Sequence, residues 1–425
     1  MLFSLVSSGS NAHGQLAIGT TDDAHTFSSC TFYDGDSRKC SISEKIIHIA
    51  NGGNHTLLLS EYIQEDTGLT MKSLWGCGNG GSGQLGDCRR DEDTTVFRRI
   101  NLQLAEYGLE GYQPRLICCS WETSYVVLSS ERKSDVLLSM GSNDFGDLGV
   151  GRGTSVHAKL FQTVQFNHCL EVDGLALDGV YLQVISISTG QHHVIVQLHV
   201  QLSDESRQTL IVGWGAARHG QLGDTSTLNK NTPFFSLPKI IEVPHHPNDP
   251  VVQIALGHQH SVLLHESGRL TELGSNKKSQ IAGLDEFRNV SFVGCTWNGT
   301  YVVDACGTLY ATGSHSKGQL GRSPPSASIH PHPVEFPFRI TSARCLSGFA
   351  CGSEHILVLK TESGFTPEVW GWGWNEHGNL GLGSTMDVHT PLKLWPQEVD
   401  HVNLIATGIW AGCGTSWIAL EKQSL

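Results

Sequence analysis

The sequence is poor in charged residues, and it lacks the long apolar runs that mark membrane proteins. Charged residues make up only 16% of the 425 residues, while glycine is abundant at 48. This composition excludes a highly charged disordered chain and favours a protein of short strands and tight turns. No apolar run reaches the length that a membrane-spanning helix needs, so we expect no membrane partner.

The chain also lacks any block of lysine or arginine. It has 28 Lys and Arg against 41 Asp and Glu, a formal net charge of −13. Because phosphate backbones attract basic surfaces, direct nucleic-acid binding is disfavoured, and a basic protein partner is easier to accommodate. Residues 1–6 carry no positive charge and only a short apolar run. We therefore expect no signal peptide and a cytoplasmic or nuclear location.

The cysteine pattern provides no zinc site of the usual form. The 12 cysteines are scattered, and no Cys-x-x-Cys pair occurs. Histidines are densest at 192–193, 245–246 and 330–332, but no cysteine or carboxylate is spaced to complete a Cys/His site with them. We expect reduced, mostly buried thiols, no metal and no cofactor.

One glycine pattern invites a nucleotide-binding interpretation, but its context argues against it. Residues 76–81 match the G-x-G-x-x-G pattern of dinucleotide-binding sites. Such a site needs a following helix, whose N-terminus holds the pyrophosphate. The next residues, 82–86, read Ser-Gly-Gln-Leu-Gly, which is poor helix material. Nucleotide binding is therefore disfavoured, and no catalytic residue is assigned.

What the chain does contain is an internal repeat built from two alternating motifs. The first motif reads Gly-x-Asn-x-x-Gly-Gln-Leu-Gly in ideal form, and its Gln and Asn side chains can bond turn backbone. Its seven copies begin at Gly9, Gly78, Gly141, Gly215, Gly274, Gly313 and Gly373. The second motif is a small residue, a glycine, then His or Ser/Thr before an apolar strand, as in residues 50–59 and 255–264. It also occurs seven times, and we predict that Trp121, Trp297 and Cys413 replace its glycine.

The alternation predicts an all-β, seven-bladed β-propeller. Short strands bounded by glycine need their faces covered and their edges protected, and a closed ring of sheets achieves both. The chain starts on the later half of a unit and finishes on the earlier half. Joining residues 405–420 to residues 2–19 completes one blade. We predict a single propeller over residues 1–425, closed by pairing of the N- and C-terminal segments.

In these motifs the chain resembles the regulator of chromosome condensation repeat family over essentially its whole length. Residues 119–124 and 214–224, with the degraded copy at 274–281, look like the fungal alpha-tubulin suppressor (killer-toxin insensitivity) branch. The family resemblance implies a propeller without catalysis of its own. The branch resemblance implies a protein partner, a small CSL-type zinc protein that serves diphthamide synthesis and Elongator-dependent modification of tRNA wobble uridines.

Two alternatives to a non-enzymatic binding scaffold stay open. The founding member of the family stimulates nucleotide exchange on the small GTPase Ran and sits on nucleosomes through a basic N-terminal extension. Here the first repeat begins by residue 9, which puts chromatin attachment in doubt but leaves exchange on a Ran-like GTPase possible. The other alternative is an enzyme that uses the channel mouth as its pocket.

The residues that break the repeat are the best candidates for a partner surface. Tryptophan is enriched at binding hot spots, and turns between the first two strands of each blade should gather around the central channel. The candidate partner-binding residues are Trp121, Glu122, Trp297, Asn298, Ile409 and Trp410. The alternative is that these indoles pack against neighbouring blades.

Two further sets of residues have structural and functional interpretations. Histidines 55, 193, 260 and 355 share one repeat position. We expect them to make structural hydrogen bonds within each blade. Long segments between motifs are where binding specificity often resides on a rigid scaffold. These segments are residues 20–45, 152–184, 225–250 and 322–343.

Overall fold

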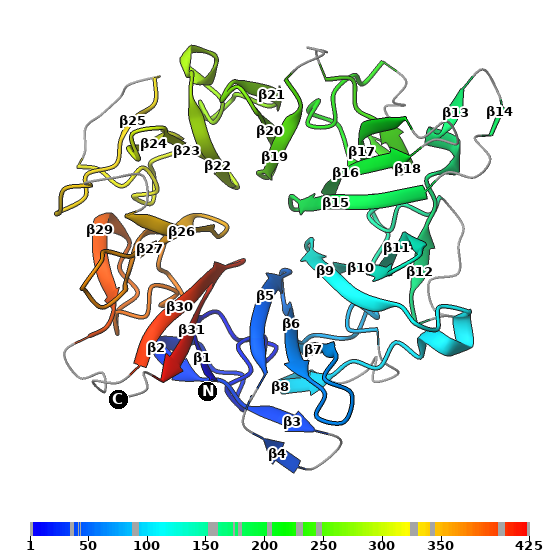
Figure 1. The fold of residues 1–425 in the computed structure, drawn as a ribbon. Helices are drawn as coiled ribbons and strands as arrows, with labels where there is room; N and C mark the ends of the chain where they lie inside the picture. The colour runs from blue at the N-terminus through cyan, green and yellow to red at the C-terminus, as the bar shows by residue number, and fades with distance from the viewer. Residues whose placement is uncertain are drawn as a thin grey trace.

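The chain forms a ring of seven β-sheets in the computed structural model (Figure 1). The structure describes residues 3–34, 38–40, 42, 44–86, 93–151, 160–172, 175–176, 181–201, 206–226, 233–243, 249–323, 330–340, 345–397 and 404–422. We name the sheets blades 1 to 7 in chain order. The first strand of each blade is the innermost, and its neighbours follow it outward, antiparallel in every pair except one near the rim of blade 1.

The blades have these strands. Blade 1 contains β5 (Lys45–Asn51), β6 (His55–Ile63), β7 (Thr70–Gly78) and β8 (Thr94–Arg99), extended outward by β3 (Phe32–Asp34) and β4 (Arg38–Cys40). Blade 2 contains β9 (Gln113–Cys119), β10 (Thr123–Ser130), β11 (Lys133–Gly141) and β12 (Gln162–Val164). Blade 3 contains β15 (Tyr181–Thr189), β16 (His193–Gln201), β17 (Arg207–Ala216) and β18 (Phe234–Ile240). Blade 4 contains β19 (Val251–Leu256), β20 (His260–His265) and β21 (Leu270–Gly274).

The remaining blades complete the ring. Blade 5 contains β22 (Val290–Thr296), β23 (Gly299–Asp304), β24 (Leu309–Gly313) and β25 (His332–Pro333). Blade 6 contains β26 (Leu346–Cys351), β27 (His355–Lys360), β28 (Glu368–Gly373) and β29 (Val388–Trp395). Blade 7 contains β30 (Leu404–Ala411), β31 (Thr415–Lys422), β1 (Phe3–Gly9) and β2 (Ala24–Ser29). A small ribbon of β13 (Glu171–Val172) and β14 (Leu175–Ala176), and the 3-10 helices η1 (Leu104–Tyr107), η3 (Asn167–Cys169) and η4 (Leu284–Glu286), lie in the connections.

Blade 7 closes the ring as the sequence predicts. β1 pairs with β31 in an unbroken antiparallel register from Phe3 opposite Glu421 to Gly9 opposite Thr415. The two ends of the chain therefore lie in one sheet, and the predicted pairing of N- and C-terminal segments is confirmed. The blade extends further than predicted, because β2 joins its outer edge.

The outermost strands lie inside the long segments that we expected to be linkers. β2, β12, β18 and β25 each begin in one of those four segments, so the segments are partly strand rather than surplus loop. These strands form the rims of blades 7, 2, 3 and 5, where one edge of the sheet needs no partner. Pro238 in β18 and Pro333 in β25 are tolerated for this reason, since an edge strand can lack one backbone donor.

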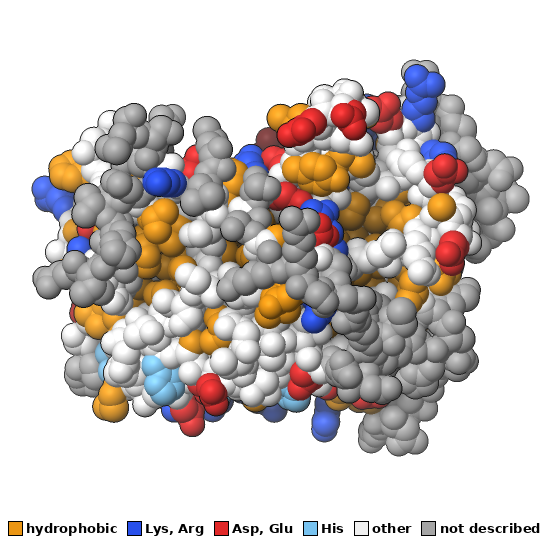
Figure 2. Space-filling model, turned by 90° about the horizontal axis from the view of Figure 1, so that it is seen from below, with side chains coloured by type: hydrophobic (Ala, Val, Ile, Leu, Met, Phe, Trp, Pro, Cys, Tyr) orange, Lys and Arg blue, Asp and Glu red, His pale blue; other side chains and the backbone are white. Residues whose placement is uncertain are grey.

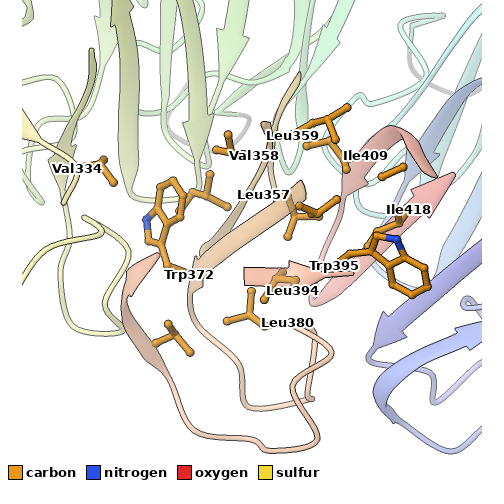
Figure 3. Close-up of a cluster of buried hydrophobic side chains, with 14 of the residues drawn as sticks. Val334, Leu357, Val358, Leu359, Trp372, Leu380, Leu394, Trp395, Ile409 and Ile418 are labelled. Atoms are coloured by element: carbon orange, nitrogen blue, oxygen red, sulfur yellow. The ribbon is translucent and has the colours of Figure 1, made fainter. Parts of the chain in front are cut away.

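The hydrophobic core lies between blades. The second strand of each blade is packed on both faces, so it reads as a continuous apolar run, as in the fully buried Leu57, Leu58 and Leu59 of β6. Figure 3 shows one such cluster, which spans blades 5 to 7: Leu357 of blade 6 lies on the side of Ile418 of blade 7, and Trp372 lies on the other side, towards Val334. The core is therefore a set of inter-blade layers, and each blade depends on its neighbours.

Trp372 and Trp214 anchor neighbouring blades to each other. Both indoles are fully buried, as expected for a shared repeat position. The Nε1 of Trp372 donates to the Gln319 carbonyl of blade 5 at 2.8 Å, and Trp214 does the same to the Asp147 carbonyl of blade 2 at 2.7 Å. Seen from the side, acidic and basic side chains lie along both edges of the disc, with hydrophobic side chains between them (Figure 2).

Candidate binding face at the channel mouth

Seven two-residue turns connect the first and second strands of the blades at one end of the ring. We call them the mouth turns, and they are residues 53–54, 121–122, 191–192, 258–259, 297–298, 353–354 and 413–414. Each is closed by backbone pairing, as where the Gly52 N–H donates to the His55 carbonyl at 2.8 Å. A cavity of about 400 Å³ lies beside these turns, lined by the innermost strands of all seven blades.

The two repeat motifs meet at these turns. In blade 1 the N–H of Asn79, the residue after the first glycine of the first motif, donates to the carbonyl of Asn54, the second residue of the mouth turn, at 2.8 Å. The same backbone hydrogen bond occurs in every blade. That glycine, Gly78, has φ of 94°, and a Cβ on it would overlap the Asn54 oxygen. The loops of both motifs therefore lie on one face of the ring, which we call the mouth face.

The predicted place of the tryptophans in the repeat is wrong by one residue. The Ser120 N–H donates to the Thr123 carbonyl at 2.8 Å, just as Gly52 donates to His55. Ser120 therefore takes the place of the glycine, and Trp121 corresponds to Gly53. Blade 5 has the same arrangement, with Thr296 paired to Gly299.

The reason that blades 2 and 5 lose the glycine is the loss of a histidine. A Cβ on Gly52 would overlap the imidazole of His55, which lies against it, and Gly190, Gly257 and Gly352 are in the same position. Blades 2 and 5 have Thr123 and Gly299 where the histidine stands. Without the ring, a larger residue fits. Blade 7 has no histidine here but keeps Gly412, so the prediction that Cys413 replaces the glycine is also wrong. A Cβ on Gly412 would overlap the side chain of Asn51.

The repeat histidines bond to the next blade, which corrects the expectation of bonds within each blade. The four contacts join an imidazole Nε2 to a hydroxyl: His55 to Ser124 at 2.8 Å, His193 to Ser261 at 3.2 Å, His260 to Thr300 at 3.1 Å and His355 to Ser416 at 3.0 Å. Burial lowers the pKa of His55 and His193 to about 3 and that of His260 and His355 to about 4. These rings are therefore neutral and structural at neutral pH.

Trp121 and Trp297 meet across the channel mouth. They belong to blades 2 and 5, which are not adjacent, yet their ring centroids are 6.0 Å apart at an interplanar angle of 50°. Each remains partly exposed. The indoles therefore pack against each other and still present surface to solvent.

The backbone holds both tryptophans in place. The Trp121 N–H donates to the Gln191 carbonyl at 2.9 Å, and the Trp121 carbonyl accepts from Gly53 at 2.7 Å. Trp297 donates to Ser353 at 2.7 Å and accepts from His258 at 3.1 Å. Each tryptophan thus bridges the mouth turns of the two flanking blades. The indole pair is presented by a rigid frame, which lowers the entropy cost of binding to it.

Further rings extend the tryptophan pair into an aromatic row. The ring of His192 lies 6.5 Å from Trp121 and 4.2 Å from Phe145, and His258 lies 6.0 Å from Trp297. Phe145 is 40% exposed, and the sequence argument missed it. The signal was available, because an aromatic residue at the tip of a loop in the first motif has no core to fill.

The other predicted partner residues differ in position. Glu122 and Asn298 are partly exposed in the mouth turns, and the Asn298 Nδ2 donates to Glu354 at 2.5 Å. Ile409 is only 8% exposed: it packs in the core cluster of blades 5 to 7 (Figure 3) and also lines the cavity. Trp410 is partly exposed and its Nε1 donates to His48 Nδ1 at 3.1 Å.

The thiols at the cavity do not form a nucleophile or a metal site. Cys118, Cys119, Cys295, Cys351 and Cys413 line the cavity. Burial raises the pKa of Cys295 to about 12 and that of Cys413 to about 11, so these thiols are protonated at neutral pH. Within the described residues no three His, Cys, Asp or Glu side chains are grouped as a metal site. The pair His245 and His246 lies outside the described residues.

Nor does the glycine pattern at residues 76–81 lead into a helix. Gly76 and Gly78 end strand β7, and residues 80–85 form the hairpin turn of the first motif. The described helices, all short, include none with the length and apolarity to cross a membrane.

Comparison with known proteins identifies the repeat. The family model described as "Regulator of chromosome condensation (RCC1) repeat" matches residues 212–264, 306–359 and 368–415. RCC1 repeat-containing protein C10F6.04 of Schizosaccharomyces pombe is 25% identical over 429 residues, which cover 99% of both chains. The secretion-regulating guanine nucleotide exchange factor of Mus musculus is 26% identical, with 95% of this chain and 81% of that protein covered.

Solved structures with the same fold include two full-length matches. Prp20p of Saccharomyces cerevisiae, described with its binding properties to Gsp1p and histones, superposes with a TM-score of 0.71 at 16% identity, covering 100% of this chain and 92% of that one. Human WBSCR16 has a TM-score of 0.69 at 18% identity, with both chains covered fully. The predicted seven-bladed propeller of this type is confirmed.

Proposed function

Since the chain carries RCC1 repeats, we propose that it is a non-enzymatic scaffold that binds another protein on its mouth face. The observation that carries this proposal is the indole pair of Trp121 and Trp297, held at 6.0 Å by backbone bonds to four neighbouring mouth turns. Exposed aromatic residues on a rigid frame are typical of binding hot spots. The protonated thiols and neutral buried histidines supply no acid, base or nucleophile there.

The partner that we propose is a small CSL-type zinc protein, which would connect the chain to diphthamide synthesis and to Elongator-dependent tRNA modification in the cytoplasm or nucleus. The support is the resemblance of residues 119–124 to the alpha-tubulin suppressor branch. In the structure these residues end strand β9 and include the mouth turn that carries Trp121. The residues that suggest this branch therefore lie on the proposed binding face.

A second candidate is guanine-nucleotide exchange on a Ran-like small GTPase. The support is the description of one relative over most of this chain as a guanine nucleotide exchange factor, and the description of Prp20p as binding Gsp1p. Both candidates place a protein on the propeller. They differ in which protein binds and in whether binding accelerates GDP release.

Two measurements separate the candidates. Affinity capture of the tagged full-length chain from its source cells, followed by mass spectrometry, should recover a small zinc protein with the CSL signature. The purified chain should leave the rate of labelled GDP release from Ran unchanged. If GDP release accelerates at catalytic amounts of the chain and no such zinc protein is captured, the exchange-factor candidate replaces the first. If no protein is captured above background, the scaffold proposal fails.

A further inference from the structure

An arc of positive charge lies on the mouth face of this acidic chain. The whole chain has a formal net charge of −13, yet blades 3 and 4 present basic side chains at neighbouring positions. We call this group the cationic arc, and it consists of Arg218, His219, His258, Lys277 and Lys278. Arg218, Lys277 and Lys278 are exposed, and the two histidines are partly exposed.

The repeat brings these residues together and fixes their backbone. Arg218 and His219 form the loop tip of the first motif in blade 3, and Lys277 and Lys278 form the same tip in blade 4. The motif glutamines accept from both tips, from His219 N–H to Gln221 at 3.0 Å and from Lys278 N–H to Gln280 at 2.7 Å. The two loops approach each other, because a Cβ on Gly220 would be 4.0 Å from the Gly274 Cα.

The described residues offset only part of the charge of the arc, since the charge of Lys278 acts on the carboxyl of Glu354. Among the described residues Arg218, Lys277 and Lys278 form no ion pair. Lys317, at the equivalent tip of blade 5, does form one, with Asp387 at 3.5 Å. Partial burial and then the charges of Lys277 and Arg218 lower the pKa of His219. These like charges are thus close enough to repel each other. A bound anion would reduce that repulsion.

The arc is continuous with the aromatic row. His258 belongs to the mouth turn of blade 4, and its ring lies 6.0 Å from Trp297. Burial, with the neighbouring His192 and His219, lowers the pKa of His258. The Nδ1 of His192 lies 3.3 Å from a carboxylate oxygen of Asp147. Because His192 has this acidic neighbour, we do not include it in the arc. An anionic ligand on the arc would therefore have an exposed indole beside it.

We propose that the cationic arc binds an acidic segment of a partner protein, with an apolar side chain of that segment against Trp297. This inference rests on the proposed function and names the chemistry of the partner. A short protein segment fits better than a nucleic acid, because the positive charge is confined to two blades. At the same loop tips, blade 2 exposes Asp144 and blade 6 exposes Glu376, which would repel an extended polyanion.

The test measures binding of an acidic peptide to the full-length chain by fluorescence anisotropy. The probe is a fluorescein-labelled peptide of about twelve residues, rich in Glu and Asp with one central Trp, at about 0.05 M and about 0.3 M salt, a range over which exposed charges become screened. We expect saturable binding that weakens at high salt. The double variant Arg218→Glu, Lys277→Glu should lose at least about tenfold in affinity.

A matched control reverses one arginine and one lysine elsewhere. Arg132 and Lys133 are exposed in the turn between β10 and β11, at the end of blade 2 away from the mouth. Arg132→Glu, Lys133→Glu makes the same change in net charge and should bind the peptide as the wild type does. Equal midpoints of urea unfolding for both variants will show that folding is intact.

Three outcomes of the binding assay would overturn the inference. One is equal loss of affinity in both double variants, which would indicate attraction by net charge alone. Another is equal binding of a peptide in which Gln replaces every Glu and Asp. The last is tighter binding of a twelve-nucleotide single-stranded RNA than of the peptide. If the arc variant captures the cellular partner normally while Trp121→Ala, Trp297→Ala does not, the arc inference fails and the scaffold proposal stands.

Discussion

Blades 2 and 5 differ from blades 1, 3, 4 and 6 at one point in the repeat, and the difference separates stability from binding. In the four regular blades a glycine admits an imidazole that bonds to the next blade. Blades 2 and 5 lack both the glycine and the histidine, and carry Trp121 and Trp297 in their mouth turns instead. The regular blades therefore bond to the next blade through a buried imidazole, whereas the tryptophans of the irregular pair bond to neighbouring blades through their backbone and present two partly exposed indoles.

The largest effect that this comparison predicts is acid sensitivity from the four regular blades. Buried histidines with pKa of about 3 to 4 face an unfolded reference near 6.5. The unfolded chain then binds more protons below pH 6.5, so this stability is complete above pH 6.5 and is lost as the pH falls towards 4. Each histidine contributes up to about 1.4 kcal/mol per pH unit.

Urea unfolding between pH 7 and 4 measures this effect. His355→Gln should reduce the proton uptake on unfolding by about one proton over this pH window. Thr415→Ser, at the corresponding position of blade 7, serves as the control and should leave the pH dependence unchanged. An identical slope for His355→Gln and the wild type would contradict the structural role of the buried imidazoles.

The next effect is steric and concerns the glycine that faces the imidazole. Gly257→Ala should lower the free energy of unfolding by about 1 to 3 kcal/mol, because the new Cβ would overlap the His260 ring. Ser120→Ala at the same position of blade 2 should cost less than about 1 kcal/mol, since no ring lies there. Urea unfolding at pH 7 compares the two variants.

A double variant sharpens this comparison. His260→Ala removes the ring and leaves the Thr300 hydroxyl without that partner, a loss of about 1 to 3 kcal/mol. Gly257→Ala added to it should then cost less than in the wild type, because only the overlap of the new Cβ with the Thr296 carbonyl oxygen remains. The difference between the two costs is the coupling energy of a double-mutant cycle. Simple additivity of the two losses would show that the glycine is kept for the Thr296 carbonyl and not for the imidazole.

The sequence was sufficient for the ring but not for the contacts between blades. Seven alternating motif pairs and their phase at the two ends predicted the blade number and the closure through β1 and β31. The rim strands were missed, because edge strands such as β25 are short, tolerate proline and carry no regular pattern. The bond from His55 to Ser124 crosses 69 residues, and local pattern gives no sign of such a partner.

The sequence singled out the two tryptophans of the candidate site, but it did not predict how they are arranged. Trp121 and Trp297 stood out because they break the repeat, although their place in it was wrong by one residue. That the two rings meet could not be read from the chain, since it depends on the curvature of the closed ring. Phe145 and the cationic arc escaped notice because variation at loop tips looks like tolerated surface change.

Stability is expected to change least in the tryptophan variants, and binding most. Trp121→Ala, Trp297→Ala removes two partly exposed indoles and leaves the backbone bonds of the mouth turns in place, so the unfolding midpoint should stay near that of the wild type. Trp370→Ala removes another partly exposed indole, on strand β28 towards the end of blade 6 away from the mouth, and serves as the matched control.

Affinity capture of the protein partner by these variants is the most direct test of the central claim that the mouth face binds protein. We expect Trp370→Ala to capture the partner as the wild type does, and Trp121→Ala, Trp297→Ala to lose at least about 2 kcal/mol of binding free energy, a more than tenfold fall in affinity. Undiminished capture by the folded double variant would contradict the claim.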